Sequence, residues 1–366
     1  MKRFLLLLPL AASILSAAEP LAKNVILFIG DAGGIPTLNA ASLHRYNQPQ
    51  RLFLQSMPYL ALSDTSAADT WVTDSAAGMT AIVTGQKTNN GVLSQTAAAV
   101  RGKKDGEVLK TILEYAEERG LSTGVISNMT ITDATPAACY AHSNDRGATG
   151  PIFAQILNPR HGDGIDLVIG AGRSTILKAT EAIGLQIEPA LRGKGYSFYD
   201  SLQAVSPRDR RVVALFDTND FSLDETVDKA LAILGQNPKG YFLMVEWDAH
   251  TDMLKRGLEQ VVALDDIMRK TAARVKPDTL LMFAADHSFD LRLLSGKPGE
   301  PILVEPVNGS SSAPAPKPNI RVGTGHTGEE VVVAAMGPGA SRVRGFIPNT
   351  QLFHIMMSAY GWSPDR

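Results

Sequence analysis

The sequence holds a single cysteine, Cys139, among its 366 residues. An intrachain disulfide is therefore impossible, and the folded chain must draw its stability from its core or from bound metal. An excess of positive charge is also absent, since 35 Lys and Arg against 37 Asp and Glu give a net charge of −2. This balance argues against a nucleic-acid-binding surface and against binding to anionic membranes.

A long hydrophobic run is found only at the N-terminus. Residues 1–18 begin with Lys2 and Arg3, continue as an apolar stretch and end in small residues. This arrangement predicts a secretory signal peptide that is cut near Ala18. The apolar stretch is short for a membrane span, and no later stretch is long enough to cross a bilayer. We therefore expect an exported protein, either periplasmic or secreted.

What the sequence does contain is an alternation of apolar runs with helical patterns. Runs rich in Val, Ile, Leu and Phe predict strands at 24–30, 122–128, 166–172, 211–216, 240–246 and 278–286, with a weaker one at 330–337. Helices are expected at 75–84, 106–118, 222–234, 255–272 and 348–359. Near-continuous apolar strands are typical of a parallel sheet buried on both faces. The predicted fold class is α/β, a three-layer sandwich with a mostly parallel central sheet covered by helices on both faces.

Acidic and imidazole side chains stand at the carboxyl ends of several predicted strands or just before one. They are Asp31, Glu246, Asp286, His287 and His326. The chemistry of parallel sheets collects beyond the carboxyl ends of their strands, so these side chains are expected to meet. Each Asp alone could be a helix cap, but the set together indicates a site for polyvalent metal ions.

The segment VEWDAHTD, residues 245–252, offers further ligands. If the chain stays extended past the strand, Glu246, Asp248, His250 and Asp252 point to the same side. Carboxylates crowded on one face repel one another unless cations hold them, and these ligand types suit zinc, magnesium or manganese. A solvated loop is the alternative interpretation.

The stretch VTDSAAGMTAIVTG, residues 72–85, places Asp74 and Ser75 directly before a helical run of small residues. One interpretation is a helix cap, because Asp and Ser accept the free N–H groups of a helix start. The other is that Ser75 is a nucleophile, held where those N–H groups and the helix dipole favour negative charge.

Residues 130–146 carry Asp133, Thr135 and Arg146. Pro136 can begin a helix with Thr135 as its cap, so capping is one interpretation of both Asp133 and Thr135. Arg146 could form a surface salt bridge, or its planar guanidinium could bind a phosphate through two hydrogen bonds.

These residues together fit phosphoryl transfer. Two metals about 4 Å apart can flank an in-line displacement, and metal coordination can activate a serine hydroxyl. Arg146 would then hold the non-bridging phosphoryl oxygens. A Ser-His-Asp acyl hydrolase is the rival, but Ser75 lacks the glycine two positions earlier that the G-x-S-x-G elbow requires.

The sequence resembles the alkaline phosphatases. The matching runs follow the order of that family and span nearly all of the chain: KNVILFIGD (23–31), VTDSAAGMTAIVTGQKTNNGVL (72–93), ISNMTITDATPAACYAHSNDR (126–146), YFLMVE (241–246), AADHS (284–288) and GHTGEEVVVAAMGPGA (325–340). The resemblance implies a single catalytic domain over residues 19–366. Within it, residues 295–320 are dense in Pro, Gly and Ser, which predicts a long loop. It also implies hydrolysis of phosphate monoesters and makes a homodimer a fair expectation.

The resemblance further implies a role for each matched residue. Ser75 would form a phosphoserine intermediate, and Asp74 would orient Arg146, which would bind the substrate phosphate. The implied cofactors are two zinc ions and one magnesium ion. Their ligands would be Asp31, Asp286 and His287 for the zinc that contacts Ser75, His326 for the other zinc, and Asp31, Asp133, Thr135 and Glu246 for magnesium.

One segment departs from the family pattern, in which an aspartate follows the glutamate by five residues and a histidine follows by four more. Position five after Glu246 is Thr251, so the loop is shortened. Counting back from residues 261–266 makes His250 the best match for the histidine. Asp248 is the first choice for the carboxylate and Asp252 the second, and a third possibility is that Glu246 serves this zinc. A metal-dependent phosphodiesterase, or an exported phosphate- or metal-binding protein with a decayed site, remains an alternative.

Overall fold

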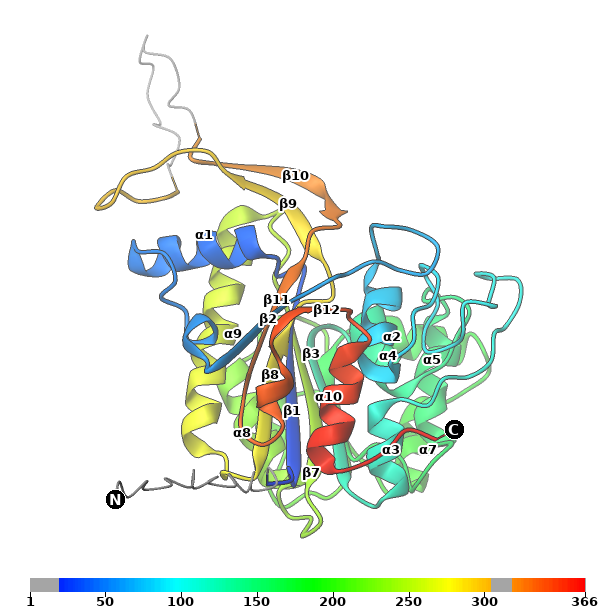
Figure 1. The fold of residues 1–366 in the computed structure, drawn as a ribbon. Coiled ribbons are helices and arrows are strands. Elements are labelled where there is room, and N and C mark those ends of the chain that lie inside the picture. The colour runs from blue at the N-terminus through cyan, green and yellow to red at the C-terminus, as the bar shows by residue number, and fades with distance from the viewer. Residues whose placement is uncertain (1–19, 304–317, 366) are drawn as a thin grey trace, which may run out of the picture.

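The computed structural model describes residues 20–303 and 318–365. The predicted signal peptide at 1–18 lies outside the described residues, as does most of the predicted loop at 295–320. A central sheet runs through the molecule with helices on both of its faces (Figure 1). The predicted three-layer α/β architecture is confirmed.

The large sheet has ten strands, of which β11 alone runs antiparallel to its neighbours. The strong apolar runs form its centre, where burial on both faces selects Val, Ile, Leu and Phe. Its order from edge to edge is β12 (Gly345–Ile347), β2 (Tyr59–Ser63), β11 (Val331–Met336), β8 (Thr279–Ala284), β1 (Asn24–Asp31), β7 (Tyr241–Asp248), β3 (Ser122–Thr130), β4 (Leu167–Ala171), β6 (Val212–Phe216) and β5 (Ser197–Tyr199).

The helices divide between the two faces of this sheet. One face is covered by α1 (Ile35–Tyr46), α8 (Leu223–Leu234) and α9 (Leu254–Arg274). The other is covered by α2 (Ser75–Thr84), α3 (Ile112–Glu118), α4 (Ala134–Tyr140), α5 (Thr149–Ala154), α6 (Arg173–Glu181), α7 (Ile187–Gly193) and α10 (Gln351–Tyr360). No helix in the described ranges is long and apolar enough to cross a membrane.

The predicted helix at 106–118 is wrong in its first half. The helix α3 begins at Ile112, where the Thr111 side chain accepts from the Glu114 N–H and the Glu114 side chain accepts from the Thr111 N–H. This reciprocal capping fixes the helix start. The residues before it pair instead with the preceding loop, through a bridge between Gln95 and Val108.

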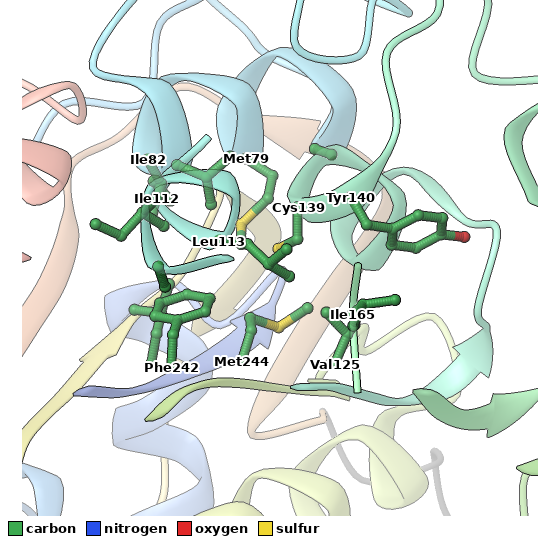
Figure 2. Packing of buried hydrophobic residues seen from close by; sticks show 14 of the residues in the cluster. Met79, Ile82, Ile112, Leu113, Val125, Cys139, Tyr140, Ile165, Phe242 and Met244 are labelled. Carbon is green, nitrogen blue, oxygen red and sulfur yellow. The ribbon is translucent and has the colours of Figure 1, made fainter. Parts of the chain in front are cut away.

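A hydrophobic core holds α2 and α4 against the sheet. Figure 2 shows Met79 and Ile82 from α2 facing Leu113 of α3, with Phe242 and Met244 of β7 beneath them. Burying each such side chain contributes roughly 1.5–3 kcal/mol. The thiol of Cys139 in α4 lies in the same core, and burial raises its pKa, so this cysteine is a packing residue. The core therefore fixes the two helices whose N-terminal ends carry Ser75 and Asp133.

A second, two-stranded sheet extends from the sandwich on the side of α1 (Figure 1). It pairs β9 (Ser288–Leu293) antiparallel with β10 (Ile320–Thr327). His287 directly precedes β9 and His326 lies in β10, where it pairs with Phe289. This small sheet therefore brings two histidines that are distant in sequence into one place.

Candidate active site

The nucleophile candidate lies at the first position of α2. Asp74 is the N-cap residue, and its side chain accepts from the Ala77 N–H at 3.1 Å. Ser75 is 4% exposed, and its Oγ lies 3.1 Å from His287 Nε2. The two interpretations of this stretch are thus compatible, since Asp74 caps the helix while Ser75 stands at its start.

The small residues of α2 let the helix approach the end of β8. A Cβ atom added to Gly78 would lie 2.7 Å from the carbonyl oxygen of Asp286, which no real Cβ contact reaches. A larger residue here would push the helix away from the sheet. The run of small residues after Ser75 therefore sets how closely the serine sits to the residues that follow β8.

Two groups of candidate metal ligands meet at this edge of the sheet. Asp31, Asp286 and His287 each offer an atom within 4.8 Å of the others, and so do His250, His287 and His326. Asp31 Oδ1 lies 3.3 Å from His287 Nε2. The rings of His287 and His326 stack with centroids 3.6 Å apart.

The third histidine completes this cluster. His250 Nε2 lies 3.5 Å from His326 Nε2, so two ring nitrogens point at one another as they do around a shared cation. The other ring nitrogen of His250 lies 2.9 Å from Asp248 Oδ1. A carboxylate that holds the far nitrogen of a histidine fixes the ring orientation and makes it a better metal ligand.

The buried carboxylates nearby repel one another. Burial, followed by the charges of Asp286 and Glu246, holds the pKa of Asp31 well above its ordinary value. Burial likewise raises the pKa of Glu246 well above its usual range, although the Ser127 hydroxyl donates a hydrogen bond to it. Crowded buried carboxylates of this kind repel one another unless protons or cations are bound among them.

Imidazoles have the opposite effect on the third acid. Burial by itself raises the pKa of Asp286, but His287, His250 and His326 together with a hydrogen bond from the Ala32 N–H outweigh it, and the pKa lies below its ordinary value. Burial lowers the pKa of His287 to about 4. A buried neutral imidazole beside an ionised carboxylate is the ligand form that a divalent cation binds.

Hydrogen bonding gives a separate test of fit to a cation. Asp31 Oδ1 and Glu246 Oε1 are buried and accept no hydrogen bond from the residues that the structure describes. An unsatisfied buried carboxylate oxygen costs folding free energy unless a cation or a donor meets it. The donor set of oxygens and imidazole nitrogens therefore fits divalent metal ions.

Asp133 and Thr135 approach the same edge from α4. The predicted Thr135 cap is wrong, since α4 begins at Ala134 and its cap is Asp133, which accepts from the Ala134 N–H at 2.6 Å. The hydroxyl of Thr135 is committed elsewhere and donates to Asp286 Oδ2 at 3.3 Å. Capping therefore explains Asp133 but not Thr135.

Arg146 is held by two of these acids. Its guanidinium donates to Asp74 Oδ2 at 3.1 Å and to Asp133 Oδ1 at 2.7 Å. Burial opposes its charge, but Asp133 and Asp74 outweigh burial and raise the pKa of Arg146. The result is a fixed cation beside Ser75, suited to binding an anion.

Comparison with known proteins agrees with this geometry. A family model described as alkaline phosphatase matches residues 22–202 and 213–313. The chain belongs to the alkaline phosphatase family.

Curated relatives are between a quarter and a third identical to this chain over the aligned residues. Alkaline phosphatase 4 of Bacillus subtilis is 28% identical over 415 residues, covering 91% of this chain and 88% of the relative. Alkaline phosphatase of Escherichia coli is 28% identical over 425 residues, covering 94% and 88%. The tissue-nonspecific isozyme of Felis catus is 29% identical over 332 residues, covering 73% of this chain, and the match spans only 63% of that relative's length.

Solved structures show the same fold. The alkaline phosphatase from the Antarctic bacterium TAB5 superposes with a TM-score of 0.78 at 22% identity, covering 94% of this chain and all of that chain. The Thermus thermophilus alkaline phosphatase gives a TM-score of 0.79 at 23% identity, covering 98% and 97%.

In this member of the alkaline phosphatase family, the structure shows the path of the shortened segment after Glu246. The strand β7 continues to Asp248, which pairs with Asp31 of β1, and then ends. The chain does not stay extended as the sequence interpretation assumed, and Asp252 lies exposed to solvent. Of the two carboxylates considered for this site, Asp248 lies beside His250 and Asp252 lies outside the cluster.

Two further residues support the site and were not identified from the sequence. Ser127 donates to Glu246, and Asn128 Oδ1 accepts from the Asp248 N–H at 2.8 Å. Both lie near the carboxyl end of β3. Functional side chains collect at the carboxyl ends of parallel strands, and this applies to β3 as well. Ser and Asn carry no charge, however, so nothing in the sequence distinguishes them from ordinary polar residues there.

Proposed function

We propose that this chain hydrolyses phosphate monoesters through a phosphoserine formed at Ser75. The observation that carries the proposal is the 3.1 Å separation of Ser75 Oγ from His287 Nε2, at a helix N-terminus. It sets a serine hydroxyl against the cluster of buried acids and imidazoles that fits divalent cations. A binding protein has no need for a serine in that position.

The groups of the site have separate roles in phosphoryl transfer. Divalent cations, when bound, supply the positive charge that activates a hydroxyl and stabilises the oxygens of the reacting phosphoryl group. Arg146 holds the non-bridging phosphoryl oxygens, and Asp74 fixes the angle of its guanidinium. The free N–H groups at the start of α2 favour the negative charge beside Ser75.

The reaction then runs in two steps. The Ser75 hydroxyl loses its proton and the bond from its Oγ to phosphorus forms as the bond to the leaving oxygen breaks, and the departing alcoholate takes up a proton. Water next attacks phosphorus, loses a proton and cleaves the phosphoserine, which releases inorganic phosphate, and Ser75 Oγ takes up a proton to become a hydroxyl again. Both steps are in-line displacements, so Arg146 can hold the same oxygens throughout.

We propose two zinc ions and one magnesium ion as the cofactors. Their ligands would be Asp31, Asp286 and His287 for the zinc beside Ser75, His250 and His326 with Asp248 for the second zinc, and Asp31, Asp133, Thr135 and Glu246 for magnesium. The support for this assignment is the donor chemistry of each group and the family's order of motifs. Residues 19–366 are proposed as one catalytic domain, and export rests on the signal peptide predicted at 1–18.

The test is hydrolysis of p-nitrophenyl phosphate by wild type and Ser75→Ala, after metal stripping and refilling with zinc and magnesium. We expect metal-dependent turnover by wild type, a loss on the order of a thousandfold or more in Ser75→Ala, and a covalent phosphate detectable by mass spectrometry only in wild type. Ser56→Ala, a change at an exposed serine, is the matched control and should retain full activity.

The alternatives predict different outcomes. Faster hydrolysis of bis-p-nitrophenyl phosphate than of the monoester would indicate a phosphodiesterase. Absence of turnover with any divalent metal, together with tight phosphate binding, would indicate a binding protein. Full activity in Ser75→Ala would overturn the phosphoserine mechanism.

A further inference from the structure

One exposed aromatic side chain stands beside the proposed site. Trp71 belongs to the irregular segment between β2 and α2, four residues before Ser75. The same segment contacts the histidine cluster, because the carbonyl of Thr73 lies 3.1 Å from His326 Nδ1. Four residues span at most about 14 Å when extended, so the backbone of Trp71 lies no farther than this from that of Ser75.

The backbone around Trp71 is fixed on two sides. The Asn90 side chain donates to the Val72 carbonyl at 3.2 Å and accepts from the Asp74 N–H at 2.9 Å. Gly328, two residues after His326, packs against Trp71 so closely that a Cβ there would lie 2.8 Å from the Trp71 carbonyl oxygen. The position of this residue is therefore set by the same elements that set the nucleophile.

The side chain of Trp71 contrasts with the other two tryptophans of the chain. Trp71 is 85% exposed, whereas Trp247 is 4% exposed. Trp362 stacks on Tyr360 with ring centroids 4.0 Å apart. Trp247 and Trp362 thus pack against other residues. The ring of Trp71 is exposed to solvent, on a fixed segment beside the site. The neighbouring Val72 is also 40% exposed, which adds apolar surface at the same place.

We propose that Trp71 is a specificity-determining residue that stacks on a planar aromatic ring in the leaving group. This inference rests on the proposed monoesterase function and names its substrate class: phosphate monoesters whose alcohol carries a flat ring, such as nucleoside monophosphates. Trp71 has no charge with which to bind the phosphoryl group, and Arg146 is the residue proposed to bind it. An indole face stacks on any aromatic ring, which a nucleobase supplies and a bare sugar lacks.

The experiment compares adenosine 5′-monophosphate with ribose 5-phosphate. Both release a primary alcohol at the same ribose carbon, so their leaving groups differ chiefly in the adenine ring. We expect the ratio of their kcat/KM values to fall roughly tenfold in Trp71→Ala, mainly through a higher KM for the nucleotide. Trp71→Phe should restore most of the ratio, because phenylalanine also offers an aromatic face.

Two controls separate stacking from a structural effect. Phe346→Ala removes another large exposed aromatic, 76% exposed on the edge strand β12 and three strand positions from β8, and should leave the ratio unchanged. In a Ser75→Ala background, adenosine 5′-monophosphate should quench tryptophan fluorescence and ribose 5-phosphate should not. Adding Trp71→Phe should abolish that quenching.

The outcomes distinguish this inference from the function on which it rests. A wild type that hydrolyses neither substrate overturns the proposed function and this inference with it. A wild type that hydrolyses both, with a ratio that stays within twofold in Trp71→Ala, overturns the role of Trp71 alone. Quenching that survives Trp71→Phe would do the same.

Discussion

Two groups of buried acids lie at opposite ends of β3, and they are held in different ways. At the start of the strand, Glu117 accepts from the Thr123 hydroxyl and from the Gly164 N–H at 3.0 Å, while Asp166 accepts from the Thr123 N–H at 2.9 Å. Burial raises the pKa of Glu117 to about 8 and that of Asp166 to about 6. Neutral donors satisfy the oxygens of both acids.

At the other end of β3, one oxygen of each acid lacks such a donor. Asp31 Oδ1 and Glu246 Oε1 are buried without a hydrogen bond in the described part of the chain, and the imidazoles of His287 and His250 lie 3.3 and 3.8 Å from Asp31 Oδ1. Burial and a raised pKa are common to both groups, so neither property identifies a metal site. What separates the groups is the combination of orphaned carboxylate oxygens with converging ring nitrogens.

The largest effect is expected from Asp31→Asn. The amide removes a charge that the proposed zinc and magnesium share, so activity should fall on the order of a thousandfold. The metal-free variant should also unfold at a higher temperature than metal-free wild type, because a buried carboxylate without partners destabilises the fold. Thermal unfolding and phosphatase assays with and without metal measure both effects.

Glu117→Gln is the matched control for that substitution. It changes a buried acid at the other end of β3 and should retain metal-dependent activity. If both variants lost metal response equally, the distinction between the two groups of acids would be wrong.

A smaller effect is expected from Asp248→Asn. The carboxylate lies 2.9 Å from His250 Nδ1, so its loss should free the ring and lower activity by about 10–100-fold. Asp252→Asn should change activity less than twofold, because Asp252 is exposed to solvent. Metal content per chain after dialysis should fall in the first variant and stay at the wild-type value in the second. The reverse pattern would assign the site to Asp252.

The central strands were predictable because their physical environment leaves a simple pattern. Strands such as β1 and β6 are buried on both faces and read as continuous apolar runs. The strands β2, β5 and β12 were missed because they are short and partly exposed, so their residues are mixed. Of these, β5 and β12 are the two edge strands, and β2 lies beside β12. Edge position depends on strand order, which no local stretch of sequence records.

The site shows the same limit. Asp31 ends β1 while Asp286 and His287 follow β8, and the rule for parallel sheets was sufficient to expect them together. The course of the chain after Asp248 was not predictable, because tertiary contacts decide it. A Cβ on Gly257 of α9 would lie 2.1 Å from the His250 carbonyl oxygen. The path of the chain at His250 therefore depends on its packing against a helix that lies later in the sequence.

Removal of metal should produce a moderate change in stability. A cation that binds only the folded state at about 100 times its dissociation constant stabilises by about 2.7 kcal/mol. For a domain of this size that corresponds to a fall in Tm of about 4 °C on chelation. Calorimetry with and without a chelator measures it. An unchanged Tm would mean that the orphaned oxygens of Asp31 and Glu246 bind no cation.

The smallest effect is expected at Glu117, whose two carboxylate oxygens already accept hydrogen bonds. Glu117 has a folded-state pKa of about 8 against an ordinary value of 4.5, so between these values the folded state binds more protons than the unfolded state. Its contribution to the free energy of unfolding must therefore fall as pH rises from about 5 to 8. Glu117→Gln mimics the protonated acid and should raise Tm at pH 9 by about 2–4 °C, with little change at pH 5. A variant less stable than wild type at pH 9 would show that the ionised carboxylate is the favoured form, and that the donors at this end of β3 hold a charge after all.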